Sequence, residues 1–406
     1  MSTINHGAAV AELAANFDHW DPDQAACLPD TFRQLRDKCP VAHSDRHGGF
    51  WVLTRYDDVE EVLKNPGDFS SRYTSIPRGM FGEFTILPPI QLDPPAHAMF
   101  RKLLVKPFTA QNVQKWEDLV RLDCRAVISQ FIDQGRVEVS SEYAKFIPLR
   151  LMATMLGISP DDEGRFASWI KRILEMGAVD PDGALAAAGE MQVYLAGSIA
   201  DHRANPKDDV ITLLIDSEVD GAKLNDEDLL GALFLLILAG MDTTWGMITA
   251  AIYHLSQHPE DRDRLAADPS LLPVAIEEFV RYFAPVHEGR SATRTVELNG
   301  VTIQKGDPIL VCFGAANRDP AAFESPETVI IDRKANRHFG FGVGIHRCLG
   351  AHLARLEVRL ALEEWLRAIP EFWLAEPEKV RWSTGQLWSP KDVVVGFPAG
   401  GTRGAE

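Results

Sequence analysis

The chain has 406 residues, of which 46% are hydrophobic and 24% are charged, a composition typical of a globular protein that buries a large core. Its formal net charge of −17 argues against a nucleic-acid-binding surface, and its five scattered cysteines argue against a secreted disulfide framework. The N-terminus lacks the basic start and apolar run of a signal peptide, so we expect a cytoplasmic protein without a membrane or nucleic-acid partner.

Helical periodicity dominates the chain, and strand signals are few. The sequence therefore predicts a mainly α protein with small β-sheets at its edges, and loose termini at about residues 1–15 and 398–406. We expect helices at 30–39, 56–65, 97–108, 113–132, 163–177, 189–204, 229–253, 273–283 and 349–369. We expect strands at 49–56, 307–314 and 392–397, and a hairpin at 295–303 with its turn at Asn299 and Gly300.

The longest apolar run, 229–241, is too short to span a bilayer and indicates a buried core helix. Asn225 is expected to cap it. Further along, "LAGMDTTWG" places Gly240, Asp242 and Thr243 where the helix should weaken, with the Thr243 hydroxyl bonding back to the Ala239 carbonyl. The helix could simply reach the surface there. Because the apolar pattern resumes afterwards, we interpret the polar break as a functional groove.

The segment "EEFVR" places Glu278 and Arg281 three residues apart on one helix face. Such pairs are common on solvated helices. The surrounding apolar residues favour a buried pair with a structural rather than catalytic role.

The segment "FGFGVGIHRCLG" surrounds one cysteine, Cys348, with glycines. Glycines let the backbone turn beneath the sulfur and direct N–H groups at it, and a thiolate is both a soft metal ligand and a nucleophile. His346 is placed to bind a nearby anion. A zinc site would need more ligands at short spacing, a nucleophile would need a base, and an inert cysteine would not need the glycines. A phosphate-binding loop would need a βαβ context. A cofactor ligand is the favoured interpretation.

Taken in order, "DPPAHAMFRKLLVKPFT", "AGMDTT", "EEFVR", "FGAANRDPAAFESP" and "FGFGVGIHRCLG" resemble the cytochrome P450 haem-thiolate monooxygenases of bacteria, over nearly the whole chain. The resemblance implies a single triangular helical domain, residues 1–406, that holds haem b, with Cys348 as the metal ligand. It implies cofactor contacts at His97, Arg101, Ala239, Gly240, Thr243, Arg290, Gly340, Phe341, Gly342, His346, Cys348, Leu349 and Gly350.

The resemblance also implies roles for polar residues away from the metal. Asp242 and Thr243 would be catalytic, as the route that delivers protons. Glu278 and Arg281 would pair with Arg333 and brace the cysteine loop without taking part in the chemistry.

The implied reaction inserts one atom of O2 into a small apolar organic substrate. Because the chain has no flavin or iron–sulfur segment, electrons would come from NAD(P)H through a ferredoxin reductase and an acidic ferredoxin. The ferredoxin would dock on the cysteine side, where the resemblance places Lys102, Lys106, Arg337, Arg347 and Arg355.

The substrate is expected to be a monoterpenoid-like molecule to be hydroxylated, or a small aromatic to be hydroxylated or O-demethylated. A haem-binding sensor or carrier without turnover is the alternative, disfavoured by the proton-delivering "DTT"; a cysteine hydrolase without haem is a third. The pocket wall is expected to comprise Thr85, Ile86, Leu87, Leu235, Ala239, Val286, His287, Gln386 and Leu387, with Thr85, His287 and Gln386 as polar anchors.

Overall fold

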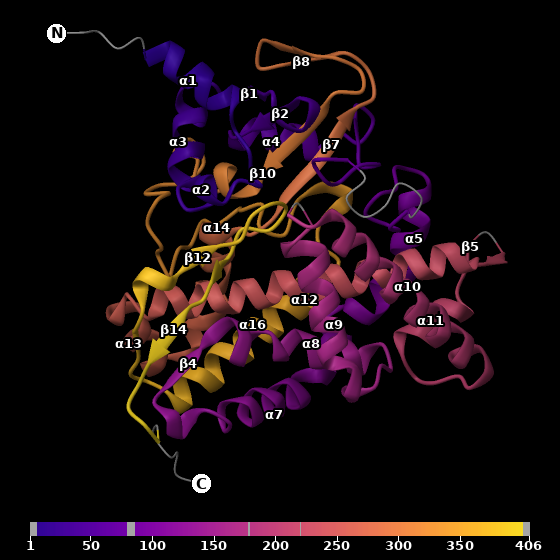
Figure 1. The fold of residues 1–406 in the computed structure, drawn as a ribbon, viewed down its shortest axis with the longest axis vertical. Coiled ribbons are helices and arrows are strands. Elements are labelled where there is room, and N and C mark those ends of the chain that lie inside the picture. The colour runs from indigo at the N-terminus through magenta and orange to yellow at the C-terminus, as the bar shows by residue number, and fades with distance from the viewer. Residues whose placement is uncertain (1–5, 79–85, 178, 220, 401–406) are drawn as a thin grey trace.

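The computed structural model describes residues 6–78, 86–177, 179–219 and 221–400. Figure 1 shows a broad body of packed helices with a smaller part above it that holds most of the sheet. The helices are α1 (His6–Ala15), α2 (Pro22–Ala25), α3 (Leu28–Lys38), α4 (Tyr56–Lys64), α5 (Ala96–Val105), α6 (Ala110–Val113), α7 (Glu117–Ile128), α8 (Phe146–Met155), α9 (Glu163–Ile170), α10 (Pro181–Ala204), α11 (Val210–Asp216), α12 (Asp226–Leu255), α13 (Pro259–Ala267), α14 (Leu272–Phe283), α15 (Phe313–Ala316) and α16 (Ala351–Ala368).

The strands form one sheet of five, in the order β1-β2-β10-β7-β3, and several small sheets. Strand β10 pairs in parallel with β2 and antiparallel with β7, which places the start of β7 beside the helical body. The strands are β1 (Val41–Ser44), β2 (Phe50–Leu53), β3 (Phe69–Ser70), β4 (Arg136–Glu138), β5 (Glu218–Val219), β6 (Ala222–Lys223), β7 (His287–Ala292), β8 (Val296–Leu298), β9 (Val301–Ile303), β10 (Pro308–Cys312), β11 (Trp373–Leu374), β12 (Arg381–Trp382), β13 (Pro390–Lys391) and β14 (Val394–Gly396). The fold is thus mainly α with small sheets, as the sequence predicts.

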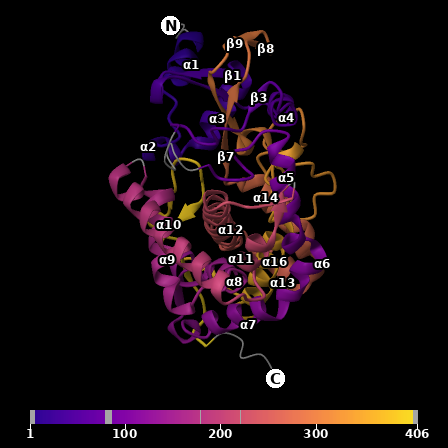
Figure 2. The same cartoon turned by 90° about the vertical axis from the view of Figure 1, so that its right-hand side faces the viewer.

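Helix α12 is the centre of the helical body. Its first turn is capped by the Asn225 side chain, which accepts a hydrogen bond of 2.8 Å from the Asp228 amide. Figure 2 shows α12 end-on, and it packs against α8, α10, α14 and α16. By length and composition α12 could cross a membrane, but 67% of its most apolar window is buried in the protein, so it is a core helix rather than a membrane span.

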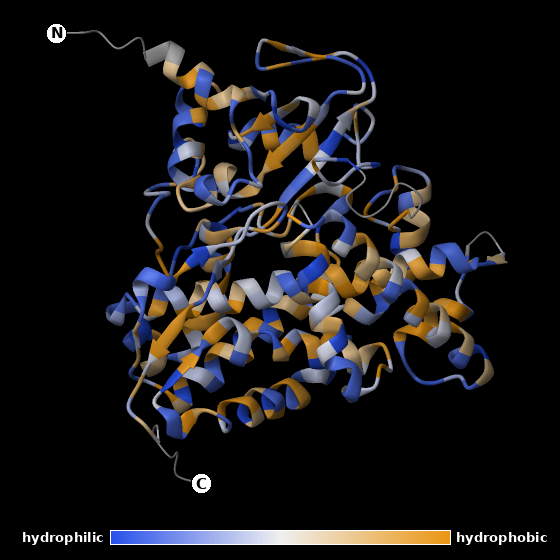
Figure 3. Ribbon diagram, in the orientation of Figure 1, coloured by the Kyte–Doolittle hydropathy of each residue, from blue (hydrophilic) through white to orange (hydrophobic). Residues whose placement is uncertain are grey.

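Two elements were harder to predict from periodicity. Helix α8 is mostly apolar, with Ile147, Leu149, Leu151 and Met152 all buried, and its narrow polar side of Arg150 and Thr154 is too small to reveal a helical period. Strand β7 was hard to predict for the opposite reason, because most of its residues are polar. Figure 3 shows it as mostly hydrophilic, whereas β2 and β10 of the same sheet are hydrophobic. The predicted hairpin is present as β8 and β9, with positive φ angles of 50° at Asn299 and 77° at Gly300.

The termini are more ordered than predicted. Residues 6–15 form α1, in which Val10 and Ala14 are buried, so the loose N-terminus predicted to about residue 15 is wrong for this stretch. At the other end, the Gly400 amide donates to the Ile132 carbonyl at 2.9 Å, which holds residues 398–400 against the body. Residues 401–406 lie outside the described part of the chain.

Candidate functional site

The cysteine loop is a tightly folded turn that ends at the N-terminus of α16. The Cys348 amide donates to the Phe341 carbonyl at 2.8 Å, which closes the loop. Gly344 has φ of 75°, and a Cβ there would lie 2.6 Å from the Leu63 carbonyl oxygen in α4. A Cβ on Gly340 would lie 2.6 Å from the Val280 carbonyl oxygen in α14. These two glycines therefore fasten the loop to neighbouring helices, a role that their sequence context alone did not distinguish from cofactor contact.

The Cys348 sulfur opens onto an internal cavity rather than the outer surface. Burial raises the pKa of the thiol, and the Gly350 amide and the guanidinium groups of Arg101, Arg355 and Arg347 lower that pKa in part. A metal cation on the sulfur would take the place of the proton outright. The loop thus presents one sulfur to the cavity, and a backbone amide and nearby guanidinium groups stabilise its thiolate form.

The cavity lies between this loop, α12 and the start of β7, and has a volume of about 300 Å³. That volume falls within the range of protein sites that bind small molecules and cofactors. Most residues predicted for cofactor contact line it: Arg101, Ala239, Gly240, Thr243, Arg290, Gly340, Phe341, Gly342, His346, Cys348, Leu349 and Gly350.

Three cationic or donor side chains line the cavity, those of Arg101, Arg290 and His346, whereas His97 does not line it but lies beside His346. The His97 and His346 rings lie 4.3 Å apart, and the Nε2 atom of each is buried without a hydrogen-bond partner. Arg101 reaches the Arg347 carbonyl, and the carboxylate nearest Arg290 is Glu288, at 3.5 Å. Burial, with the charges of Arg290, His97 and Arg101, lowers the pKa of His346 to about 3. The cluster has two unused ring nitrogens, and the Arg101 guanidinium has no carboxylate within ion-pair distance among the described residues, which fits the two carboxylates of a haem.

The residues present therefore fit a haem, with a single sulfur ligand facing an open cavity. Among the described residues no group of three or more His, Cys, Asp or Glu side chains is placed to hold a metal ion. That arrangement disfavours the zinc site considered above, because structural zinc takes four protein ligands.

Helix α12 forms the wall opposite the cysteine loop. The Thr243 hydroxyl donates to the Ala239 carbonyl at 2.8 Å, as expected. However, α12 runs without interruption from Asp226 to Leu255, so the predicted break in the helix is wrong. Gly240 lines the cavity, and a Cβ on it would lie 3.0 Å from the Met152 sulfur of α8. The glycine is therefore also needed for the close packing of α8 on α12.

Asp242 is buried, at 4% exposure, but is not among the residues that line the cavity. Its carboxylate lies 3.5 Å from the Lys391 ammonium in β13, which in turn lies 4.4 Å from the centre of the Trp245 ring. The buried carboxylate thus has a cationic partner on the side of α12 that leads toward the C-terminal strands.

The apolar part of the predicted pocket wall is largely present: Leu87, Leu235, Ala239, Val286 and Leu387 line the cavity. Gln386 also lines it, with its amide nitrogen donating to the Thr74 carbonyl at 2.6 Å, which leaves its amide oxygen as an acceptor. Ile86 does not line the cavity, so its prediction as a wall residue is wrong. Thr85 lies outside the described residues.

His287 lines the cavity, as predicted. Its ring packs edge-on against Phe32, at 5.6 Å between centroids, and lies 6.4 Å from the His19 ring. Both ring nitrogens are buried and have no hydrogen-bond partner. The alternation of β7 directs the ring toward these aromatic side chains.

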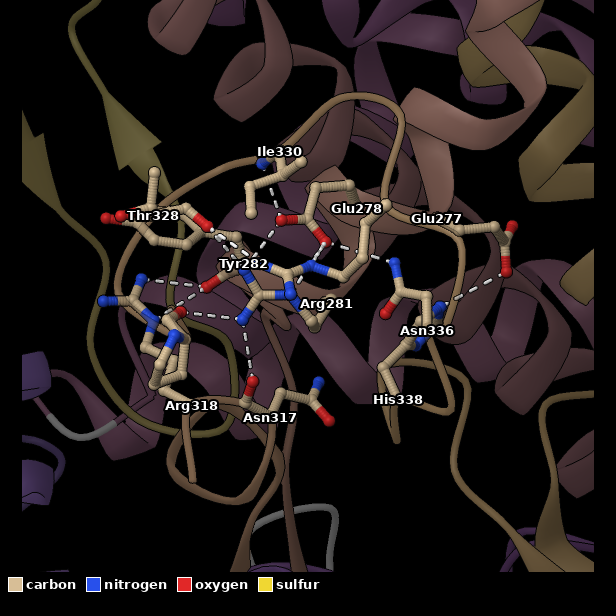
Figure 4. Close-up of polar contacts among 12 residues, drawn as sticks. Glu277, Glu278, Arg281, Tyr282, Asn317, Arg318, Thr328, Ile330, Asn336 and His338 are labelled. Atoms are coloured by element: carbon tan, nitrogen blue, oxygen red, sulfur yellow. Dashed lines mark hydrogen bonds and ion pairs between the residues drawn. The ribbon is translucent and has the colours of Figure 1, made fainter. Parts of the chain in front are cut away.

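Glu278 is the centre of a buried polar network beneath the cysteine loop (Figure 4). It is fully buried and accepts from Arg281 at 2.8 Å and from Arg333 at 2.9 Å. It also accepts from the Ile330 amide at 2.8 Å and from Asn336 at 3.1 Å. Arg281 bonds three carbonyls in turn, those of Asn317, Pro326 and Thr328. The network therefore fastens α14 to the chain that leads into the cysteine loop.

Glu357 is a cavity residue that the sequence reasoning missed. It lies on α16, is 1% exposed and lines the cavity, and its Oε1 atom has no hydrogen-bond partner. Burial raises the pKa of this carboxyl well above its usual value. The signal was available in the sequence, because Glu357 follows Leu353 by four residues and so lies on the apolar face of the helix.

Replacing Glu357 by glutamine should make stability less dependent on pH. The unfolded chain loses this proton near pH 4.3, whereas the native state retains it to higher pH, so the wild type loses about 1.4 kcal/mol of unfolding free energy per pH unit across that interval. The advantage of E357Q should therefore grow in urea unfolding as the pH rises above the pKa of the unfolded chain. The exposed Glu371→Gln is the control, and parallel curves for E357Q and wild type would contradict the assignment.

Comparison with known proteins agrees with this geometry. The family model described as cytochrome P450 matches residues 195–370. The mycinamicin IV hydroxylase/epoxidase of Micromonospora griseorubida is 34% identical over 374 residues, which cover 89% of this chain and 93% of that protein. Cytochrome P450-terp of a Pseudomonas species is 31% identical over 398 residues, 90% of this chain and 92% of that protein.

Solved structures show the same fold over nearly the full length. The crystal structure of CYP101J2 has a TM-score of 0.85 and 29% identity, covering 94% of this chain and 96% of that one. The structure of CYP109E1 from Bacillus megaterium, in complex with testosterone, has a TM-score of 0.86 and 29% identity, covering 93% and 99%. Together with the cysteine loop and the cavity that it faces, these similarities show that the chain belongs to the cytochrome P450 family of haem-thiolate monooxygenases.

Proposed function

We propose that this protein holds haem b through Cys348 and inserts one oxygen atom into a small apolar organic substrate. The observation that carries the proposal is a single cavity with the Cys348 sulfur on one wall, Thr243 on another and an apolar lining between them. When bound, the haem supplies the activation of O2 and the transfer of one of its atoms to carbon. The protein contributes orientation, exclusion of water and protons.

Different residues of the chain would bind the haem and deliver protons. His97, Arg101, Arg290 and His346 would bind the haem carboxylates, and the Nε2 atoms of the two histidines have no other hydrogen-bond partner. The Thr243 hydroxyl donates to the Ala239 carbonyl, and its oxygen can still accept a hydrogen bond from the cavity side. Asp242, one residue away and paired with Lys391, would carry protons toward Thr243 from the side of the C-terminal strands.

An optical titration tests the proposal. The purified protein should be coloured and, when reduced under carbon monoxide, should show the Soret band of a thiolate ligand. Small terpenoids and small aromatic ethers should then displace water and shift the ferric spin state. A colourless protein, or a reduced spectrum without thiolate character, would overturn the proposal.

Replacing Thr243 by alanine should uncouple electron use from oxidation. Without the hydroxyl, protons arrive poorly and NAD(P)H-derived electrons leave as hydrogen peroxide, with a loss of coupled turnover of the order of 10²-fold. The assay compares peroxide with oxidised product. Thr249→Ala is the matched control, because Thr249 donates to the Trp245 carbonyl at 3.0 Å in the same helix but does not line the cavity. Thr243→Ser should restore coupling, and unchanged coupling in T243A would remove Thr243 from the proton route.

We further propose that electrons arrive from an acidic ferredoxin, itself reduced by an NAD(P)H reductase, docking near α5 on the cysteine side. Lys102, Lys106, Arg337 and Arg347 are exposed there, on a protein whose net charge is −17. None of these four has a carboxylate within ion-pair distance among the described residues, so their charge is available to a partner. Arg355 was also predicted to belong to this basic surface, but its guanidinium is paired with Glu277 at 2.6 Å.

Charge reversal of this patch should slow electron delivery. Lys102→Glu together with Lys106→Glu should lower the rate of reduction by ferredoxin about 10- to 100-fold at low salt, and the difference should shrink as salt is added. Stopped-flow reduction measures the rate, with dithionite as a reductant that the change leaves unaffected. Lys305→Glu, in the exposed turn after β9, is the control. An equal rate for the double variant and wild type would place the docking site elsewhere.

The substrate assignment rests on the lining. Leu87, Leu235, Val286 and Leu387 offer apolar contact, and the Gln386 oxygen offers one acceptor. These features support a small, mostly apolar molecule of terpenoid or aromatic type with at most one hydroxyl to satisfy. A cytoplasmic location, where such electron donors are found, is part of the same proposal.

A further inference from the structure

Gly231 lies near the start of α12, inside its longest apolar stretch, and is buried. The Ile86 carbonyl oxygen occupies the place where a side chain at position 231 would begin, and the Pro88 Cδ atom lies 2.9 Å from that point. Both neighbours belong to a chain segment 145 residues earlier (231 − 86). The missing Cβ of Gly231 therefore lets a distant backbone rest directly on α12.

The segment that rests there is a compact turn. The Leu87 amide donates to the Gln91 side chain at 3.0 Å, and the Gln91 amide donates to the Leu87 carbonyl at 3.1 Å. Leu87, Pro89 and Ile90 from this turn all line the cavity, and Leu87 is only 2% exposed. These reciprocal bonds make the turn move as a unit, so its position on α12 sets the position of three wall residues together.

The opposing wall comes from the same helix. Leu235 follows Gly231 by one helical turn, so the two lie on one face of α12, and Leu235 lines the cavity. The seating of the turn on this face therefore affects the space that Leu87 and Leu235 border together.

We propose that Gly231 determines ligand size in this enzyme without touching the ligand, by letting the Leu87–Gln91 turn settle against α12. The inference rests on the proposed function, because it concerns the cavity that would hold the substrate. Helix α12 is packed against α8, α10, α14 and α16 and is the less able of the two to move. A methyl group at position 231 would push the turn outward by about 1 Å, the shift that restores a normal carbon–oxygen contact.

The expected effect is a change in size preference. A gap of about 1 Å at an apolar wall forfeits a quarter to a half of its dispersion contacts, which we expect to weaken a small ligand that just fills the cavity roughly three- to tenfold. The same change should weaken the binding of a larger ligand less, or should strengthen it, if that ligand is crowded in the wild type. A ligand that contacts the metal alone should not respond.

The test uses imidazoles of graded size, whose binding is read from the optical shift of the ferric haem: imidazole, 4-phenylimidazole and a naphthyl-substituted imidazole. In Gly231→Ala the Kd for imidazole should be unchanged, that for 4-phenylimidazole should rise three- to tenfold, and the naphthyl-to-phenyl preference should shift toward the larger ligand. Gly197→Ala is the matched control, because that glycine lies in α10 with no atom within 4 Å of its built Cβ. It should bind all three as the wild type does.

A second variant keeps the test informative if Gly231→Ala does not fold. Gln91→Ala removes the side chain that holds the Leu87 amide and leaves α12 untouched, so it should loosen the same turn and give the same shift in preference. Unchanged preference in folded, haem-loaded G231A, or in Q91A if G231A does not fold, would overturn the inference. Failure of imidazole to bind the wild type would instead count against the proposed function.

Discussion

Replacing Cys348 by alanine should abolish both the thiolate signature of the reduced carbon monoxide complex and substrate oxidation. Among the described residues the cavity offers no other thiol, since the four remaining cysteines lie outside its lining. A thiolate donates electron density that favours cleavage of the O–O bond, so its loss removes the chemistry rather than weakening it. Coupled turnover should fall to background in a product assay.

The control for this variant is Cys27→Ala, a change at an exposed cysteine in the N-terminal part of the chain. It should retain the full spectrum and activity. Haem content should be measured alongside, because His97, Arg101, Arg290 and His346 still offer donors to the haem carboxylates. A Cys348→Ala protein that kept the thiolate band would show that Cys348 is not the metal ligand.

Replacing Glu278 by glutamine should destabilise the fold more than any other single change considered for this chain. Glu278 is fully buried and is the carboxylate on which Arg281 and Arg333 converge. Removing the negative partner leaves two buried guanidinium groups without an anion, which costs about 3–5 kcal/mol of unfolding free energy. Because the network holds the chain leading into the cysteine loop, haem should be lost in the same transition.

Glu277, the residue before Glu278 in the sequence, provides a comparison for the stability effect. Glu277 pairs with Arg355 at 2.6 Å and with His338 at 3.2 Å, but its side chain is 28% exposed. Glu277→Gln should therefore cost about 1 kcal/mol or less, because water replaces part of what is lost. Denaturant unfolding at equal haem loading measures both variants. If E278Q were no less stable than E277Q, the bracing role of the network would be wrong.

Some structural features could be predicted because they depend only on residues that are close in the sequence. The cap of α12 at Asn225, the hairpin turn at Asn299 and Gly300, and the bond from Thr243 to Ala239 each depend on residues close in sequence. The family resemblance rested on short motifs in a fixed order, and these needed no knowledge of packing. Fold class and reaction class therefore followed from the sequence.

Other features depended on which way a side chain turns once elements pack. His287 was expected to line the cavity and does so, but only the structure shows that the alternation of β7 directs its ring toward Phe32. Asp242 was placed correctly on α12, yet its partner Lys391 lies 149 residues away, beyond any local pattern. Helix α8 went unnoticed because burial on nearly all sides erases the periodicity that reveals helices.

The sequence by itself determined the mainly helical fold, the cysteine that faces the cavity and the motif residues around it, because each is encoded by neighbours within one or two helical turns. Only the tertiary structure decided the unpaired donors of His97 and His346, the isolated carboxyl of Glu357 and the contact of Ile86 with Gly231. The physical reason is that charge compensation, burial and cavity width are properties of segments brought together from far apart in the chain, and no local spacing records them.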